Sequence, residues 1–324
     1  MIRPSRRVTE WSDQILGFAT LQKFARLDRE THFGFRKTMP LVSHFHPAVL
    51  VGLIGAGIQA SRTPSMHERE GTAQGLRYVY QRIDLEQLGL GGDALPDLLT
   101  AAERMGFAGL NITHPCKQTV MPLLTELSAD ARAIGAVNTV VLQAGKRIGY
   151  NTDWWGFAES FRRSLPDVKL DRAVQLGAGG AGAAVAHAAL TLGLRELTVF
   201  DLEHARSQQL ADHLNARFGA GRAIAGDDLN SAIGKADGLI HATPTGMANY
   251  PGLPLPADLL HPALWVAEIV YFPMETELLR AARSIGCRTL DGGGMAVFQA
   301  VEAFRLFTGI TPDAQRMLEH FAAM

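Results

Sequence analysis

The chain has 324 residues, 47% of them hydrophobic, and a formal net charge of −1 at pH 7. This length and apolar content suffice for two domains of ordinary size. The near-neutral charge does not indicate nucleic acid or an anionic membrane surface as a partner, and no run of about 18 apolar residues predicts a membrane span. The two cysteines, Cys116 and Cys287, are too few for a disulfide framework, so we expect a reduced, cytoplasmic setting.

Residues 1–46 differ in composition from the rest of the chain. They hold eight Lys and Arg against four Asp and Glu, and they lack the apolar stretch of a signal peptide. The acidic residues also argue against a transit peptide. We expect an N-terminal extension that is partly disordered or loosely helical. Met39 precedes the first predicted strand, which leaves a later translation start as an alternative.

From residue 49 onward, short apolar runs alternate with helical patterns, which predicts an α/β fold with parallel sheets and crossover helices. The predicted strands span 49–54, 78–83, 107–111, 137–142, 173–176, 196–200, 238–241 and 265–270. The predicted helices span 64–74, 94–105, 116–126, 128–134, 153–164, 180–192, 203–217, 275–285, 294–308 and 312–322.

A domain boundary is expected near residues 150–155. We expect an N-terminal α/β substrate-binding and catalytic domain that comprises 47–152 plus 292–324, because the last helices return to it. Residues 153–291 are expected to form a Rossmann-type dinucleotide-binding domain. A cleft between two such domains is a common small-molecule site.

A strand followed by a glycine turn occurs twice in the chain. The second turn, Gly177-x-Gly179-x-x-Gly182, follows the strand AVQL and opens a helix of small residues. The next strand, LTVFD, ends at Asp201, 22 residues after Gly179. A dinucleotide site needs helix amides for the pyrophosphate and an acidic residue at about this distance for the adenosine ribose. The second turn therefore predicts the cofactor site.

The first turn, Gly55-x-Gly57-x-x-Ala60, does not meet these requirements. Pro64 suits the first turn of a helix, so the helix is expected to start late. The next strand, RYVYQRID, offers no acidic end at the right distance, because Asp84 is too far along. We interpret this turn as a site for something other than a dinucleotide.

Ser61 and Thr63 follow the first turn and precede the expected helix. Neutral hydroxyls beside helix amides can hold a small carboxylate. A helix cap without any ligand is the simpler alternative for these two residues.

Further stretches give the chain a recognisable order of motifs. They are NITHPCK (111–117), GAVNT (135–139), GYNTDWWG (149–156), HATPTGM (241–247), VYFPMETELLRAA (270–282) and DGGGMAVFQAVEAF (291–304). Together with SRTPSMH and GAGGA, they resemble the shikimate/quinate dehydrogenase family from about residue 50 to 310. The resemblance is closest to the NAD-dependent branch of that family.

The resemblance implies an oxidoreductase that uses NAD to oxidise the C3 hydroxyl of shikimate, and of quinate, reversibly to 3-dehydroshikimate and 3-dehydroquinate. It implies no metal, no nucleic acid or membrane partner, and a monomer or a homodimer. Such chemistry fits aromatic amino acid biosynthesis or quinate catabolism. Three alternatives stay open: an NADP-dependent biosynthetic shikimate dehydrogenase, an aminoshikimate dehydrogenase, and a non-catalytic sensor of quinate or shikimate.

The resemblance also implies the site residues. Lys117 is the expected acid/base and Asp153 its partner, and both also belong to the substrate site. The other expected substrate contacts are Ser61 and Thr63 to the carboxylate, and Thr113, Asn138, Tyr271 and Gln299. The expected cofactor contacts are Gly177, Ala178, Gly179, Gly180, Ala181, Asp201, Thr243, Ile269 and Gly292. Taken alone, Lys117 reads as a solvated loop lysine and Asp153 as a helix cap.

Asp201 favours NAD over NADP. Its carboxylate is expected to accept hydrogen bonds from the ribose hydroxyls and to repel a 2′-phosphate. Two unit charges about 4 Å apart repel by roughly 4 kcal/mol at an effective dielectric constant of about 20. Arg206 offers a counter-charge only if its loop turns it inward.

Overall fold

The computed structural model describes residues 48–324. The extension expected at residues 1–46, with the alternative start at Met39, lies outside the described residues. The described part of the chain contains two sheets of six strands each. None of the helices within residues 48–324 has the length and apolar character needed to cross a membrane.

The first sheet is mixed, with the strand order β2-β1-β3-β5-β6-β4. Its strands are β1 (Ala48–Gly55), β2 (Arg77–Asp84), β3 (Gly109–Ile112), β4 (Glu126–Leu127), β5 (Thr139–Gln143) and β6 (Lys146–Tyr150). Strand β5 runs antiparallel to both β3 and β6, so the expectation of a wholly parallel sheet is wrong here. The reason is a two-residue turn at Ala144 and Gly145, both with positive φ, which can join only antiparallel neighbours.

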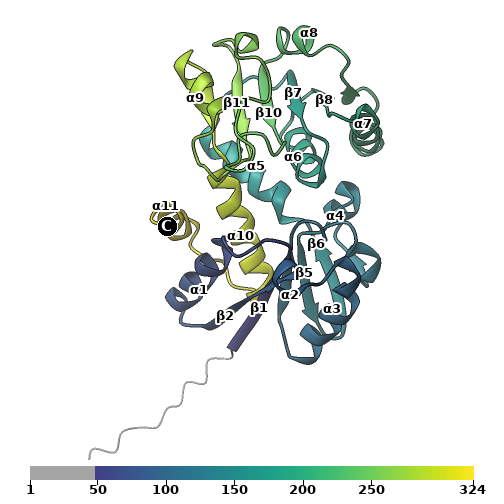
Figure 1. Cartoon of the computed structure of the whole chain (residues 1–324), viewed down its shortest axis with the longest axis vertical. Coiled ribbons are helices and arrows are strands. Elements are labelled where there is room, and N and C mark those ends of the chain that lie inside the picture. Colours follow the sequence, from purple (N-terminus) through teal and green to yellow (C-terminus); the bar gives the residue numbers. More distant parts are fainter. Residues whose placement is uncertain (1–47) are drawn as a thin grey trace, which may run out of the picture. The chain divides into compact units, whose positions relative to one another are not determined.

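The second sheet is entirely parallel, with the order β12-β11-β10-β7-β8-β9. Figure 1 shows its central strands side by side. The strands are β7 (Arg172–Leu176), β8 (Glu196–Phe200), β9 (Ala223–Ala225), β10 (Gly238–His241), β11 (Trp265–Glu268) and β12 (Arg288–Leu290). The order reverses between β7 and β10, and ligands of such sheets bind at the carboxyl ends of the strands beside that reversal.

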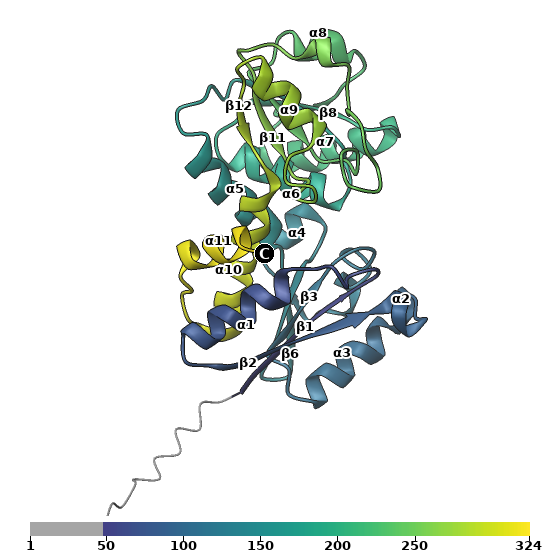
Figure 2. The ribbon, with the colours of Figure 1, turned by 60° about the vertical axis from the view of Figure 1, so that its left-hand side comes forward.

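The helices follow the predicted pattern in most places, as can be followed in Figure 2. They are α1 (Thr63–Ala73), α2 (Leu85–Leu88), α3 (Leu95–Arg104), α4 (Ala129–Ile134), α5 (Thr152–Ser164), α6 (Gly180–Thr191), α7 (His204–Phe218), α8 (Leu229–Ile233), α9 (Glu277–Ser284), α10 (Gly292–Thr308) and α11 (Ala314–Ala322). Short 3-10 turns lie at Gly92–Ala94, Met121–Leu123 and Ala257–Leu259.

The helix expected at 116–126 is wrong, because this segment forms a series of turns. The carbonyl of Lys117 accepts a hydrogen bond from the N–H of Val137 at 2.8 Å, so it is committed to a distant segment. Pro122 has no N–H to continue a helical ladder. The chain therefore stays irregular here, which leaves Lys117 on a loop.

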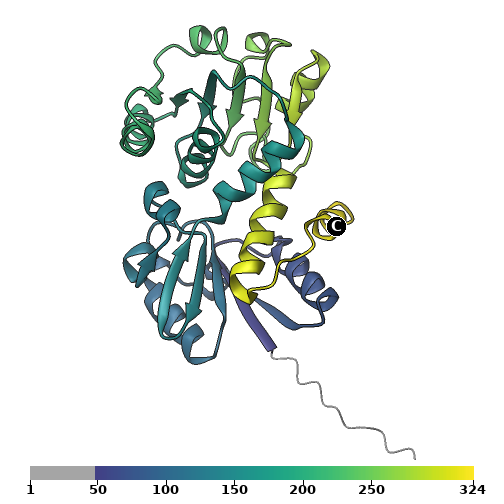
Figure 3. The same cartoon turned by 180° about the vertical axis from the view of Figure 1, so that it is seen from behind.

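Helices α5 and α10 pack closely, and Figure 3 shows them side by side. A Cβ atom at Gly156 of α5 would lie 2.6 Å from the backbone nitrogen of Gln299 and 2.8 Å from the carbonyl oxygen of Met295. One at Gly294 of α10 would clash with the Ser160 hydroxyl. Because α10 also contacts α1 and β5, the C-terminal helices return to the first sheet, as the sequence predicts.

His67 of α1 is buried in the core that α1 and α10 form over the first sheet. Its Nδ1 lies 2.9 Å from the Tyr78 hydroxyl, and its ring contacts Tyr80 and Phe304. Its Nε2 has no hydrogen-bond partner among the described residues. Burial lowers the pKa of His67 to about 3, so the imidazole is neutral in the folded protein.

This depressed pKa predicts a loss of stability in mild acid. In the unfolded chain His67 binds a proton as the pH falls through about 6.5, whereas the folded chain cannot do so until about pH 3. The folded state is therefore fully favoured above pH 6.5, and His67 alone should remove about 2 kcal/mol of unfolding free energy between pH 7.5 and pH 5. Urea unfolding at several pH values measures this change.

The matched variant for that experiment is His67→Phe, which fills the site without titrating. We expect its unfolding free energy to be lower at pH 7.5, because the Tyr78 hydroxyl loses its partner, but to fall less on acidification. An equally steep fall in the variant would contradict the assignment to His67.

Candidate active site

The first glycine turn joins β1 to α1 and is held by the buried carboxylate of Asp84. That carboxylate accepts hydrogen bonds from the Gln59 side chain at 2.9 Å and from the N–H groups of Gly57 and Ile58 at 3.0 and 3.1 Å. The hydrogen bond from Gln59, with those from the backbone, lowers the pKa of Asp84 below its ordinary value. The carboxylate thus stabilises the turn itself.

The sequence places Asp84 too far along the chain from the first glycine turn, but this expectation is wrong, because in the structure Asp84 lies beside that turn. Asp84 is the last residue of β2 and pairs with Gly55 in the parallel register of β1 and β2. The residue count misleads because α1 begins late, at Thr63, which lengthens the crossover without moving the strand end. Each of the two glycine turns therefore has an acidic residue at the end of the neighbouring strand.

Ser61 and Thr63 lie at the start of α1, as expected, and both are partly buried. The N–H of Thr63 lies 3.4 Å from the Ser61 hydroxyl, and Pro64, the second residue of the helix, has no N–H. Arg62, between them, places its guanidinium carbon 5.2 Å from the centre of the Phe321 ring in α11. Two hydroxyls, the N-terminus of a helix and a cation therefore share one corner.

Lys117 and Asp153 form the central ion pair of the site. Lys117 Nζ lies 2.6 Å from Asp153 Oδ2, and the two side chains are 21% and 9% exposed. Asp153 is in the first turn of α5, where its N–H donates to the capping carbonyl oxygen of the Asn151 side chain. The loop carbonyl of Lys117 is held by Val137. Backbone contacts on both sides therefore fix where the amine and the carboxylate meet.

Thr113 and Asn138 lie beside this pair. The Thr113 methyl packs against Gly55, where a Cβ would clash with it, so the first turn and the loop after β3 are adjacent. Asn138 is buried and exchanges two hydrogen bonds with Thr152, which precedes Asp153: Thr152 N–H donates at 2.7 Å and Asn138 Nδ2 donates at 3.0 Å. In the described structure Asn138 fixes the start of α5.

Tyr271 reaches the ion pair from the loop after β11. The residue is 43% exposed, yet desolvation of the hydroxyl raises its pKa above the ordinary value. The charges of Lys117 and Arg62 act on the phenol to lower that pKa, and the charge of Asp153 acts to raise it. Gln299, on α10, donates to the Ala296 carbonyl of its own helix at 3.2 Å.

The second glycine turn opens α6 at the carboxyl end of β7. Gly177 has a φ of +100°, and a Cβ there would lie 2.6 Å from the Ala242 carbonyl oxygen. The buried amide of Gln175 donates to the carbonyls of Gly177 and Gly182 at 2.8 and 2.9 Å. These contacts pack the inner side of the turn tightly, whereas its outer side is open.

At Gly179 and Gly180, a Cβ would meet no heavy atom within 4 Å. Neighbouring Ala178 and Ala181 are partly buried beside them. The turn therefore presents open space at the N-terminus of a 12-residue helix, where an anionic group is stabilised by the helix amides. These residues fit a dinucleotide pyrophosphate.

Asp201 follows β8 directly, beside this turn. Its carboxylate accepts hydrogen bonds from the N–H of Ala178 at 2.8 Å and of Glu203 at 3.0 Å. Arg206 is paired with Glu203 at 2.7 Å, and both of those side chains are exposed. The loop thus offers carboxylates and no free cation among residues 201–206.

Thr243, Ile269 and Gly292 gather at the same end of the second sheet. The Thr243 methyl lies 3.1 Å from the position that a Gly177 Cβ would take. A Cβ at Gly292 would clash with the Ile269 carbonyl, so only glycine lets the start of α10 approach the end of β11. The expected cofactor residues therefore form one group around the sheet reversal.

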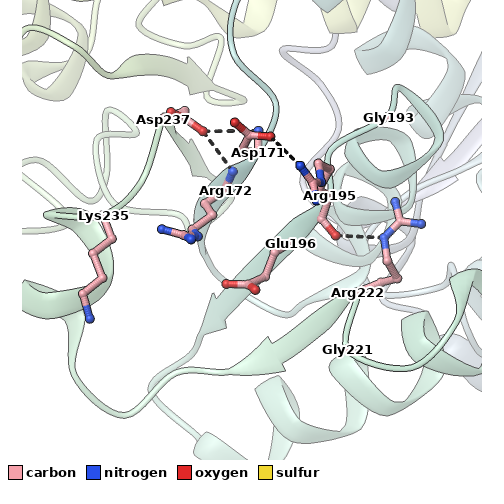
Figure 4. A pocket seen from close by; sticks show the side chains of 9 residues that line it. All are labelled: Asp171, Arg172, Gly193, Arg195, Glu196, Gly221, Arg222, Lys235 and Asp237. Atoms are coloured by element: carbon pink, nitrogen blue, oxygen red, sulfur yellow. Dashed lines mark hydrogen bonds and ion pairs between the residues drawn. The ribbon is translucent and has the colours of Figure 1, made fainter.

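A polar pocket in the described part of the chain lies away from these residues (Figure 4). It has a volume of about 790 Å³ and a polar lining that includes Arg172, Arg195, Lys235 and Asp237. Arg172 begins β7, so the pocket is at the amino ends of the strands, opposite Gly177. Sheets of this type bind ligands at the carboxyl ends, which argues against this pocket as the active site.

Sequence reasoning missed three residues near the site. Arg62 sits within a quoted motif, but only its approach to Phe321 and Tyr271 gives it a place in the site. His241 and Glu268 end two neighbouring strands and are fully buried against each other. The sequence did offer a signal for this pair, because a His and a Glu stand at the same end of two apolar strands.

Comparisons with known proteins agree with this geometry. A family model described as the shikimate dehydrogenase substrate binding domain matches residues 53–140. Another, described as the shikimate 5'-dehydrogenase C-terminal domain, matches residues 292–320.

Individual relatives match over most of the chain. A protein named shikimate dehydrogenase (NADP(+)) from Streptomyces avermitilis is 61% identical over 277 residues, which cover 85% of this chain and 95% of that protein. A quinate/shikimate dehydrogenase (NAD(+)) from Corynebacterium efficiens is 50% identical over 283 residues, covering 86% and 99%. The structure of quinate dehydrogenase from Corynebacterium glutamicum in complex with NAD aligns with a TM-score of 0.82 at 50% identity, covering 86% and 99%.

A parallel sheet with a glycine turn at its reversal is typical of a dinucleotide-binding fold, and the dehydrogenase relatives identify the chain as an oxidoreductase. The chain belongs to the shikimate/quinate dehydrogenase family. Its cofactor is a nicotinamide dinucleotide, and the names of its relatives divide between NADP and NAD.

Proposed function

We propose that the chain is an NAD-dependent dehydrogenase that oxidises the C3 hydroxyl of shikimate and of quinate reversibly to the ketone. The observation that carries the proposal is the Lys117–Asp153 ion pair at 2.6 Å, largely shielded from solvent and close to the Tyr271 phenol. An amine and a carboxylate so arranged can receive a hydroxyl proton as hydride leaves the carbon.

The proposal divides the chain by task. Residues 47–152 with 292–324 bind the substrate and carry the Lys117–Asp153 pair, whereas residues 153–291 bind the dinucleotide. In support, the matched model over 53–140 is described as a substrate binding domain. The second sheet has the strand order and glycine turn of dinucleotide-binding folds.

The substrate carboxylate binds at the start of α1 in this proposal. Ser61 and Thr63 donate their hydroxyls there, beside the helix amides. Thr113, Asn138, Tyr271 and Gln299 surround the ring. The position of Arg62 over Phe321 adds a positive charge near the bound anion.

When bound, the nicotinamide supplies the hydride acceptor. The step requires Lys117 in its neutral amine form, which then takes the hydroxyl proton at Nζ to become the ammonium, while Asp153 orients that group through its hydrogen bond. In the reverse direction Lys117 returns the proton to the carbonyl oxygen. Gly177 to Ala181 hold the pyrophosphate at the N-terminus of α6, and Thr243, Ile269 and Gly292 line the nicotinamide half of the site.

The preference for NAD rests on Asp201 and its surroundings. A 2′-phosphate beside Asp201 would meet a carboxylate, and the nearby Arg206 is already paired with Glu203. A repulsion of roughly 4 kcal/mol, reduced by solvent, still supports a preference of about tenfold or more. Overall identity to an NADP-named relative does not outweigh this, because a few loop residues decide which ribose fits.

The first test is the initial rate of reduction of NAD and of NADP, each with shikimate and with quinate, at about pH 8–9. We expect NAD to be reduced with at least one acid, at a kcat/KM about tenfold or more above that for NADP. Rates with NADP alone would refute the NAD assignment. No reduction in any of the four mixtures would refute the proposed reaction.

Lys117→Ala tests the proton acceptor. We expect kcat to fall by about 10²–10⁴, because the hydroxyl proton loses its acceptor, while shikimate binding measured by calorimetry persists. The matched control is Lys146→Ala, which removes an exposed lysine paired with Glu126 on the same sheet and should leave kcat unchanged. Near-normal turnover in Lys117→Ala would rule out its assigned role.

Asp201→Ala tests the cofactor preference. Removing the carboxylate should raise kcat/KM for NADP relative to NAD by about tenfold or more, since the repulsion with a 2′-phosphate is lost. Asp212→Ala, on the exposed side of α7, removes a charge of the same sign at a distance and should not alter the ratio. An unchanged ratio in Asp201→Ala would show that this residue does not select the dinucleotide.

A further inference from the structure

A buried histidine and a buried glutamate lie side by side at the carboxyl end of the second sheet. His241 ends β10 and Glu268 ends β11, and the two are opposite each other in the parallel register. His241 Nδ1 lies 2.9 Å from each carboxylate oxygen of Glu268. Both side chains are 0% exposed.

Every polar atom of this pair has a partner. Glu268 Oε1 also accepts the N–H of Val270 at 2.9 Å, and Oε2 accepts the Thr276 hydroxyl at 3.1 Å. A carboxylate with these donors requires a proton on Nδ1 of His241. The opposite nitrogen, Nε2, lies 2.5 Å from the Thr243 hydroxyl oxygen. The chain Glu268–His241–Thr243 therefore runs from the core to the loop after β10.

On the β10 side, this chain sets the orientation of Thr243. Its hydroxyl oxygen is held by His241 and also accepts the N–H of Thr245 at 3.3 Å. With the hydroxyl held inward, the methyl group lies against Gly177 of the dinucleotide turn. A rotation about χ1 would break the bond to His241 and push a different group toward that turn.

On the β11 side, Glu268 fixes the corner that follows the strand. The bond from Val270 N–H holds the backbone around Ile269, whose carbonyl lies against Gly292 at the start of α10. Thr276 caps α9, because its hydroxyl also accepts the N–H of Leu279. One carboxylate thus ties together the loop that carries Thr243 and the loop that carries Ile269 and Tyr271.

Stability alone does not account for the pair. The other residues of β10 and β11 are apolar or small, and a buried hydrogen-bonded pair is often no more stabilising than apolar residues of the same volume. The pair also stands at the end of the strands where ligands bind: His241 is on a strand that flanks the sheet reversal, and Glu268 is on the next strand. The position of the pair indicates a role in ligand binding at the carboxyl edge of the second sheet.

We propose that Glu268 and His241 are positioning residues for the nicotinamide dinucleotide, which hold Thr243 against the Gly177 turn and Ile269 against Gly292. The inference rests on the proposed binding of a dinucleotide at this edge. Neither side chain touches the cofactor, and both act through the loops that do.

The test compares Glu268→Gln and His241→Phe with the wild-type enzyme. The dissociation constant of NAD is measured by calorimetry, kcat and KM are measured for NAD, and the dissociation constant of shikimate is measured without cofactor. We expect the NAD dissociation constant and KM to rise about tenfold, with shikimate binding within twofold of wild type. An unchanged NAD dissociation constant in a folded Glu268→Gln enzyme would overturn the inference.

The variant Trp265→Phe is the control that distinguishes a positioning role of Glu268 and His241 from a purely structural one. Trp265 begins β11, at the opposite end from Glu268, and its indole donates to the Lys169 carbonyl at 2.8 Å. This variant should lower the melting temperature without changing the NAD dissociation constant. Equal weakening of NAD binding in Trp265→Phe and Glu268→Gln would mean that lost stability, and not positioning, is responsible.

Thr243→Val keeps the test decisive if the buried variants do not fold. It retains the shape of Thr243 but loses the bond to His241, so NAD binding should weaken as in His241→Phe. The double variant His241→Phe/Thr243→Val should bind NAD about as well as either single variant, since both substitutions break the same hydrogen bond between His241 and Thr243. Additive losses would overturn the inference. Wild-type enzyme that binds NAD but oxidises neither acid would refute the proposed reaction and leave this comparison of dissociation constants valid.

Discussion

The close packing of α5 against α10 is the constraint on which the site depends. Helix α5 leaves the first sheet and carries Asp153 in its first turn, whereas α10 leaves the second sheet and begins at Gly292. At Gly156 the α10 backbone comes so close that a Cβ would not fit. At Gly294 the Ser160 hydroxyl of α5 comes equally close. The distance between the Asp153 carboxylate and the carboxyl edge of the second sheet is therefore set by two helices in backbone contact, which deform little.

The two glycine turns show how similar local sequences acquire different tasks. Beside both turns lies an aspartate from the parallel neighbour strand: Asp84 is the last residue of β2, and Asp201 directly follows β8. Asp84 is buried and binds the first turn through two backbone amides and Gln59, and α1 starts only at Thr63. At the second turn α6 starts at once, and Gly179 and Gly180 face open space. The room above the helix N-terminus, more than the glycine count, distinguishes the proposed substrate site from the proposed dinucleotide site.

Buried polar groups hold several of the loops and helix starts around the candidate site. Asn138 holds Thr152 at the start of α5, and Gln175 holds the second turn. Glu268 and His241 hold the loops after β10 and β11. Most polar atoms of these groups have hydrogen-bond partners, because an unpaired polar atom in the core costs stability; Gln175 Oε1 is the exception, with no partner among the described residues. These hydrogen bonds from buried side chains fix the conformation of the second glycine turn and of the loops after β10 and β11.

The sequence by itself determined the α/β class, the dinucleotide turn, and the strands and helices with strong apolar periodicity, because these follow from local patterns. It did not determine the antiparallel β5, whose pairing depends on a two-residue turn, or the loop at 116–126, where Val137 takes the Lys117 carbonyl. Short strands such as β4 and β9 carry too few residues for a pattern. Only the tertiary structure decided that Lys117 meets Asp153, that Asp84 serves its own turn, and that Glu268 meets His241. These partners are 36, 27 and 27 residues apart in the chain, and hydrogen bonds over such separations are fixed by packing and strand register rather than by local sequence.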